Sequence, residues 1–203
     1  MNLLLTGFEP FGGDAVNPSE QVARLLDGQT LHGVTIHSEV LPVESARGPA
    51  ALIQAIRRVQ PDAVLCLGVA VGRAALSVER VAVNLLGYRI PDNSGVRVSD
   101  RPILPDGPAA YFTTLPVRRI CEAVQAAGVP VELSLSAGAF LCNQALYEML
   151  HYLTANGLEI PAGFIHLPAL PEQAAAKEGG KVPSMSLETI QRGVDAAIEV
   201  LGS

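Results

Sequence analysis

The 203-residue sequence contains no tryptophan, and aromatic residues make up only 4% of it. It also lacks any block of basic residues, since 14 lysines and arginines stand against 20 aspartates and glutamates and give a formal charge of -6. A phosphate backbone requires a basic surface, and unpaired bases or sugars require aromatic platforms. We therefore expect no nucleic acid among the partners of this protein.

Long hydrophobic runs are absent as well. The longest, residues 63–71 and 133–141, fall short of the roughly 18 residues that a membrane-spanning helix requires. The opening residues, Met1 to Gly7, lack the basic start and the small-residue cleavage site of a secretory signal. We expect a cytoplasmic protein that makes no contact with a membrane.

Cysteine is scarce, and the motifs that hold metals or nucleotides are missing. Cys66, Cys121 and Cys142 are widely spaced without a C-x-x-C pair, and a reducing compartment would leave all three thiols free. The sequence contains no G-x-G-x-x-G after a strand, no G-x-x-x-x-G-K-[ST] loop and no G-x-S-x-G elbow. We expect no metal ion and no organic cofactor.

Apolar residues, by contrast, make up 49% of the chain, which is enough for a large core without disulfides. Short strand-like runs alternate with longer helical ones from end to end, and no linker interrupts them. The pattern predicts a single domain over residues 1–203. Its predicted fold class is α/β, a three-layer α/β/α domain of the phosphorylase/hydrolase-like kind. The predicted sheet is mixed but mostly parallel, with residues 78–83 forming a hairpin.

The predicted elements follow one another at short intervals. Strands are expected at 3–6, 34–40, 63–67, 78–83, 131–135 and 163–166, and helices at 18–27, 53–59, 115–127, 143–154 and 186–201. Residues 88–108 form the one long irregular stretch, which is typical of a functional lid or an oligomer contact. In such folds the active site lies at the carboxyl ends of the strands.

Cys142 is the candidate nucleophile. Small residues end a strand before it, and the helix is expected to begin at or just after it. The free amides and the positive end of the dipole at a helix start stabilise a thiolate and can receive an oxyanion. A buried structural cysteine is the alternative interpretation, and it is the one that we adopt for Cys66 and Cys121.

His166 and Glu79 could complete a catalytic group. His166 ends a predicted strand and therefore lies on the same rim of the sheet as Cys142, where it could act as the base. A carboxylate commonly holds such an imidazole in its working tautomer, and Glu79 lies in a valine-rich strand where an unpartnered charge is costly. Two alternatives stay open: His166 could cap a backbone group, and Glu79 could face solvent or pair with an arginine.

Several motifs, in the same order, resemble those of the pyroglutamyl peptidase I (pyrrolidone carboxyl peptidase) family of cysteine peptidases. They are residues 6–13, 17–19, 78–84, 89–93, 136–138, 142–143 and 166–168, so the resemblance covers nearly the whole chain. It implies a catalytic triad of Glu79, Cys142 and His166, the same residues that were selected above. The implied activity is removal of an N-terminal pyroglutamyl residue from peptides, and the implied assembly is a homo-oligomer, either a dimer or a tetramer.

The resemblance also implies an apolar substrate pocket, because pyroglutamate is a neutral lactam without an ammonium group. Phe8 and Phe11 would form its walls. The full set of substrate-binding residues implied in this way is Phe8, Phe11, Asn17, Arg89, Ile90, Phe140 and Leu141.

Two alternative functions stay open. Val69 and Val71 replace residues usual in the family at the floor of the pocket, which suits a related cysteine amidohydrolase acting on another small lactam or amide. A catalytically silent binder of N-terminally blocked peptides would lack one member of the triad, and none is missing.

Overall fold

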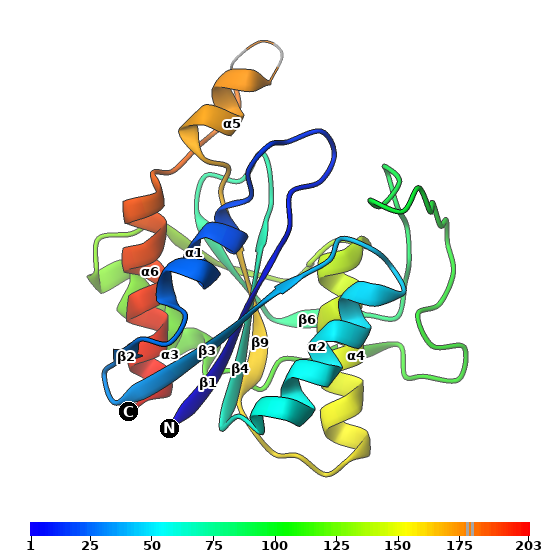
Figure 1. The fold of residues 1–203 in the computed structure, drawn as a ribbon, viewed down its shortest axis with the longest axis horizontal. Coiled ribbons are helices and arrows are strands. Elements are labelled where there is room, and N and C mark those ends of the chain that lie inside the picture. The colour runs from blue at the N-terminus through cyan, green and yellow to red at the C-terminus, as the bar shows by residue number, and fades with distance from the viewer. Residues whose placement is uncertain (178, 180) are drawn as a thin grey trace.

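A twisted sheet of seven strands forms the centre of the protein, seen here in a computed structural model that describes residues 1–203 except 178 and 180 (Figure 1). The strand order is β2-β3-β1-β4-β9-β5-β8. The strands are β1 (Asn2–Phe8), β2 (Thr30–Leu31), β3 (Val34–Leu41), β4 (Ala63–Val69), β5 (Leu76–Glu79), β8 (Val131–Ser134) and β9 (Ala162–Leu167). A separate pair consists of β6 (Val81–Val83) and β7 (Ala110–Phe112).

Helices cover both faces of the sheet. They are α1 (Pro18–Leu26), α2 (Arg47–Val59), α3 (Val117–Ala126), α4 (Leu141–Ala155), α5 (Pro171–Ala176) and α6 (Leu187–Leu201). Residues of α1, α3 and α6 form one buried cluster with the sheet, while α2 and α4 contribute to a second one (Figure 1). The predicted α/β/α layering is thus confirmed.

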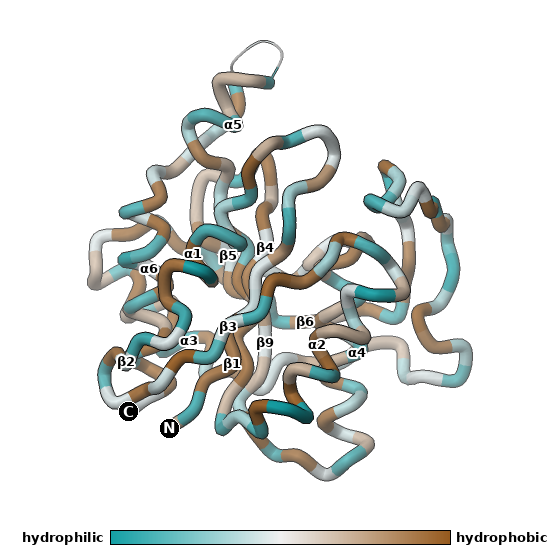
Figure 2. Tube along the Cα trace, viewed as in Figure 1, coloured by the Kyte–Doolittle hydropathy of each residue, from teal (hydrophilic) through white to brown (hydrophobic). Residues whose placement is uncertain are grey.

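The central strands are apolar on both faces because each face meets a helical layer. Leu3 and Leu5 enter the first cluster, whereas Leu4, between them, enters the second. Every residue of β4 and β9 is buried. Figure 2 shows hydrophobic residues concentrated along these central strands. Such continuous apolar runs are what a doubly covered parallel strand requires.

The sheet is mixed and mostly parallel, as predicted, but the predicted hairpin over residues 78–83 is wrong. β5 runs antiparallel to β9, and β6 pairs instead with β7 in the separate small sheet. The chain leaves the main sheet at Arg80, whose backbone N–H donates to Ser134 O. The expected strand over 78–83 is therefore divided at Arg80 into β5 and β6, which belong to different sheets.

Most other predicted elements are confirmed within a few residues. β2, β7 and α5 were missed because two or three strand residues and six helical ones carry little periodic signal. The chain between β6 and β7 is largely irregular, as expected for 88–108, and contains an isolated bridge from Leu86 to Arg101. No helix among the described residues is long and apolar enough to cross a membrane.

Candidate active site

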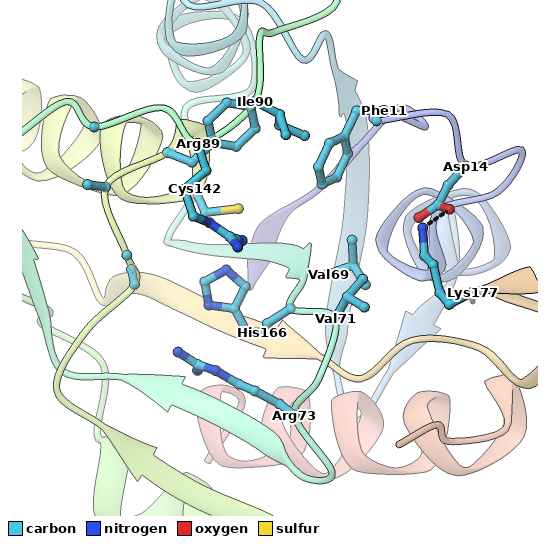
Figure 3. Close-up of a pocket in the computed structure, with 17 residues that line it drawn as sticks. Phe11, Asp14, Val69, Val71, Arg73, Arg89, Ile90, Cys142, His166 and Lys177 are labelled. Carbon is cyan, nitrogen blue, oxygen red and sulfur yellow. Dashed lines mark hydrogen bonds and ion pairs between the residues drawn. The ribbon is translucent and has the colours of Figure 1, made fainter. Parts of the chain in front are cut away.

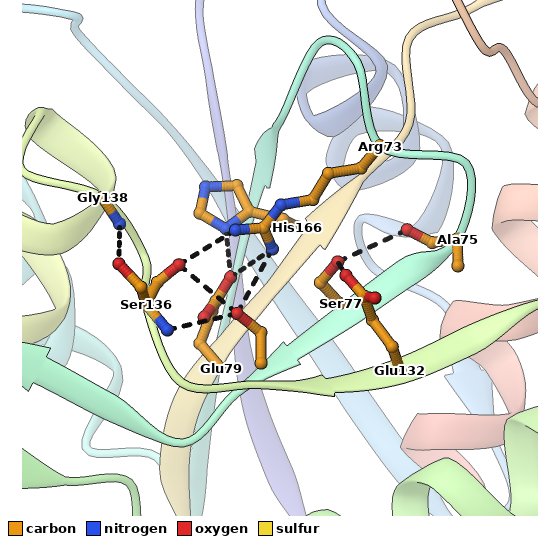
Figure 4. A network of polar contacts seen from close by, with 9 residues as sticks. Arg73, Ala75, Ser77, Glu79, Glu132, Ser136, Gly138 and His166 are labelled. Atoms are coloured by element: carbon orange, nitrogen blue, oxygen red, sulfur yellow. Dashed lines mark hydrogen bonds and ion pairs between the residues drawn. The ribbon is translucent and has the colours of Figure 1, made fainter.

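The strand register brings Glu79 and His166 together. Glu79 of β5 lies opposite Phe164 of β9, so His166 is its diagonal neighbour on the same face of the antiparallel pair. His166 Nδ1 and Glu79 Oε1 are 2.7 Å apart, and both side chains are almost completely buried (Figure 4). Because an ionised carboxylate only accepts hydrogen bonds, Nδ1 carries the proton and Nε2 is left as the basic nitrogen.

Glu79 is held as an anion by its contacts. Burial raises the pKa of its carboxyl group, but the hydrogen bonds and charge of His166, the nearby Ser134 hydroxyl and the hydrogen bond from Arg73 outweigh burial and lower the pKa below its usual value. Arg73 Nη1 donates to Glu79 Oε1 at 2.7 Å. One carboxylate oxygen therefore serves both the imidazole and the guanidinium.

Cys142 occupies the second position of α4, because the helix begins at Leu141, two residues before the predicted start at 143. Its thiol is half-buried and faces the same hollow as the His166 ring (Figure 3). The preceding N-cap residue, Phe140, makes no side-chain capping bond, so the first-turn amides stay open to a ligand. The helix start thus supplies hydrogen-bond donors beside the sulfur.

The surroundings of Cys142 favour the thiol over the thiolate. Burial raises its pKa to about 12, with smaller contributions from the charges of Glu79 and Cys66, while Arg73 lowers it. A thiol of this kind reacts only after a neighbouring base has taken its proton. His166 Nε2 is the basic nitrogen that faces the same pocket.

A cavity of about 580 Å³ opens in front of these residues. Its lining includes six residues that sequence analysis selected: Phe11, Arg89, Ile90, Phe140, Cys142 and His166. The rings of Phe11 and Phe140 lie 5.8 Å apart, and Tyr88 packs edge-on against Phe140 at 4.7 Å. The pocket therefore offers aromatic surface next to the candidate nucleophile.

The structure places three predicted substrate-binding residues away from the pocket lining. Phe8 is 2% exposed and packs on the Phe164 ring in the second core, because the last residue of β1 faces inward. Leu141 is buried in the same core. Asn17 caps α1, since its Oδ1 accepts from Ser19 N and its Nδ2 donates to Glu9 O. Phe8 is thus not among the residues that line the cavity.

Sequence reasoning missed Gly68 as a site residue. A Cβ atom there would lie 2.7 Å from Phe164 Cζ and 3.0 Å from Cys142 Sγ. A glycine that interrupts an otherwise apolar, fully buried strand is the signal that marks such a close approach.

Two loops that line the pocket are fastened to each other. Glu9 Oε1 accepts from Val43 N at 3.0 Å and from Asn93 Nδ2 at 2.9 Å. The Asn93 side chain also donates to Pro10 O. These bonds join the segment that carries Phe11 to the segment that carries Ile90.

No group of three or more His, Cys, Asp or Glu residues in the described chain is arranged to hold a metal ion. At the rim of the pocket, Lys177 forms an ion pair with Asp14 (Figure 3). The thiol of Cys142, the imidazole of His166 and the carboxylate of Glu79 lie at the centre of the site.

The whole chain matches one protein family. The sequence model described as pyroglutamyl peptidase covers residues 1–203. The chain belongs to the pyroglutamyl peptidase family. A pyrrolidone-carboxylate peptidase from Gloeobacter violaceus is 49% identical over 203 residues, covering 100% of this chain and 98% of the relative. One from Pyrococcus furiosus is 41% identical over 207 residues, covering 99% and 100%.

Solved structures of pyroglutamyl peptidases share the fold. A mutant pyrrolidone carboxyl peptidase from Pyrococcus furiosus superposes with a TM-score of 0.95 at 42% identity, covering 99% of this chain and 98% of that one. Pyroglutamyl peptidase I from Bacillus amyloliquefaciens gives 0.94 at 39% identity, covering 99% and 96%. The family resemblance found in the motifs and the predicted fold class are both confirmed.

Proposed function

We propose that this pyroglutamyl peptidase family member hydrolyses the bond after an N-terminal pyroglutamyl residue, with Cys142 as nucleophile, His166 as base and Glu79 as orienting carboxylate. The observation that carries the assignment is the Nδ1 bond of His166 to Glu79, 2.7 Å long, which leaves Nε2 basic on the side of Cys142. Residues 1–203 act as one catalytic domain.

The reaction proceeds through a thioester. His166 Nε2 takes the Cys142 proton while the sulfur attacks the carbonyl carbon that joins pyroglutamate to the next residue. The resulting tetrahedral centre collapses, the C–N bond breaks, and the leaving amine receives the proton from His166. Water, deprotonated by His166, then hydrolyses the thioester to free pyroglutamate and restores the thiol.

The oxyanion of the tetrahedral centre falls at the start of α4. The backbone N–H of Cys142 lies in the first turn, where no intrahelical acceptor exists, and the N-cap leaves it open. Arg89, exposed on the opposite loop and lining the same pocket, adds positive charge there. Both groups favour a transition state that is more negative than the substrate.

The aromatic part of the cavity suits the lactam ring. Phe11, Ile90 and Phe140 present apolar surface, and none of them requires a charge from the ligand. A free N-terminal amine would enter such a surface only at a desolvation cost. Pyroglutamyl substrates are therefore favoured over peptides with an ordinary amino terminus.

Hydrolysis of matched anilides tests this substrate assignment. Pyroglutamyl, prolyl and glutaminyl derivatives of one fluorophore differ only in the ring carbonyl or in ring closure. We expect kcat/KM to be highest for the pyroglutamyl derivative. A preference for either of the others would contradict the proposal and favour a different amidohydrolase.

We also propose a cytoplasmic homo-oligomer, a dimer or a tetramer. Cys66, Cys121 and Cys142 are all free, as in a reducing compartment. Phe112 and Leu135 are 68% and 71% exposed, and an interface between copies would cover such apolar side chains. Light scattering that gave a monomer mass at working concentration would contradict the oligomer, and cell fractionation tests the location.

A further inference from the structure

Arg73 touches two parts of the site that lie far apart in the sequence. One guanidinium nitrogen, Nη1, donates to Glu79 Oε1 at 2.7 Å, and the other, Nη2, donates to Ser136 O at 2.9 Å (Figure 4). Ser136 belongs to the loop that leads into α4 and Cys142. The planar fork of an arginine suits two acceptors held at a fixed separation.

We propose that Arg73 is a positioning residue that fixes the Glu79–His166 pair to the loop before Cys142 and sets the pH range over which the triad works. The inference rests on the proposed function, because it assigns Arg73 to the same three residues. Arg73 also lines the cavity, but Nη1 and Nη2 both donate to protein acceptors, so we infer that it acts through Glu79 and through the loop.

The carboxylate depends on this contact. Glu79 Oε2 is buried and has no hydrogen-bond partner among the described residues, so Oε1 makes the bonds to both His166 and Arg73. The Glu79 side chain is completely buried, whereas that of Arg73 is 28% exposed. Without Arg73, the only full countercharge in contact with the carboxylate would be a protonated His166.

The loop depends on it as well. Ser134 Oγ accepts from Ser136 N at 3.3 Å, and Ser136 Oγ accepts from Gly138 N at 3.2 Å, so this chain reversal is held by short-range bonds. β5 and β8 are already paired up to Glu79 and Ser134, and the bond from Arg73 to Ser136 O extends this connection past the end of β8 into the loop before Cys142. A change in that contact would shift the approach to Cys142 relative to His166.

Other charged groups surround the triad but do not make the same bridge. Cys66 of β4 contributes to the raised pKa of Cys142, and Glu132 of β8 accepts from Ser77, the register partner of His166. The groups at the pocket rim are Asp14, Arg89 and Lys177. Within the described residues, Arg73 is the cation bonded to the triad carboxylate.

Removing the positive charge should stabilise the imidazolium of His166 and destabilise the thiolate of Cys142. Both effects make it harder to take the thiol proton at low pH. The acidic limb of the kcat/KM profile therefore moves to higher pH. A loss of loop geometry alone would lower the rate by the same factor at every pH.

The test compares Arg73→Met, Arg73→Lys and the matched control Arg80→Met in the full chain. Arg80 is a half-buried arginine whose guanidinium packs on Phe112 instead of Glu79. We expect Arg73→Met to move the acidic midpoint up by about one pH unit. Arg73→Lys keeps the charge but loses the fork, so its midpoint returns toward that of the wild type while kcat stays reduced. Arg80→Met leaves both unchanged.

Alkylation of Cys142 by iodoacetamide, followed by mass spectrometry across the same pH range, gives a second readout that needs no peptide substrate. We expect its midpoint to move up in Arg73→Met as well. Unchanged midpoints in both readouts, with the variant folded by circular dichroism, would overturn the role of Arg73. A wild type that cleaves no pyroglutamyl substrate would instead refute the proposed function, while the alkylation midpoints would still decide the role of Arg73.

Discussion

His166 Nδ1 and Glu79 Oε1 lie 2.7 Å apart across antiparallel strands, with the carboxylate completely buried and the ring almost so. Glu79 lies opposite Phe164 and His166 lies opposite Ser77, so Glu79 and His166 are diagonal neighbours. The pairing of β5 with β9 therefore sets their geometry. Their contact fixes the tautomer of the imidazole and presents Nε2 to the cavity that Cys142 also lines.

Glu79→Gln should lower kcat by about 10³-fold to 10⁴-fold with little change in KM, because an amide can hold the imidazole in the wrong tautomer. Steady-state kinetics on a pyroglutamyl anilide measures this. The control is Glu132→Gln, which changes a carboxylate that bonds to Ser77 on the neighbouring strand. A variant of Glu79 within tenfold of the wild type would contradict the orienting role.

The same substitution should change how stability depends on pH. The pKa of Glu79 is lowered by folding, so its ionised form stabilises the protein above the unfolded pKa, and this stabilisation is lost as the pH falls through the folded pKa. Urea unfolding at a series of acidic pH values should show the gap in unfolding free energy between wild type and Glu79→Gln narrowing toward low pH. A gap independent of pH would show that Glu79 is not held as an anion.

Gly68→Ala should impair both folding and rate. Its Cβ would lie 2.7 Å from Phe164 Cζ and 3.0 Å from Cys142 Sγ, so one of these groups must move. We expect a destabilisation of about 1–3 kcal/mol and a lower kcat.

Gly193→Ala is the matched control for Gly68→Ala, because its Cβ would meet Leu76 Cδ2 at 2.7 Å in the opposite core. It should lower the melting temperature and leave kcat unchanged. If both substitutions lowered kcat equally, the loss of rate would come from general destabilisation and not from crowding beside Cys142.

Phe11→Ala should raise KM for a pyroglutamyl anilide about tenfold, which corresponds to about 1.4 kcal/mol of binding free energy. The effect on kcat should be smaller. The ring lines the cavity and lies 5.8 Å from that of Phe140. Phe112→Ala removes a ring that is 68% exposed on β7 and should not change KM. The same KM for both variants would show that the ring of Phe11 does not contact the substrate.

The layers, and the contact between Glu79 and His166, could be predicted from the sequence for separate reasons. Runs that are apolar at every position, such as 63–67, are rare outside doubly covered strands, so the architecture followed from them. Glu79 is a carboxylate among valines, where an unpartnered charge is costly. His166 was its expected partner because a carboxylate commonly orients a catalytic imidazole. The alternative in which Glu79 pairs with an arginine also holds, because one oxygen accepts from both His166 and Arg73.

What could not be predicted depends on pairing between distant segments. β5 pairs with β9 and β6 pairs with β7, so the two strands belong to different sheets. The local sequence around 78–83 carries no information about these distant partners. Phe8 was expected on a pocket wall because it lies in a motif beside Phe11, yet the inward face of β1 buries it. The bond from Arg73 to Ser136 O joins residues 63 positions apart.

The role of Cys142 as nucleophile is tested most directly by fluorophore release from pyroglutamyl aminomethylcoumarin in reducing buffer. Wild type, Cys142→Ala and Cys121→Ala are compared. Cys121 lies on α3, outside the cavity, and controls for loss of any thiol. We expect turnover by the wild type and by Cys121→Ala, and none above background by Cys142→Ala. Turnover that persists in folded Cys142→Ala would contradict that role.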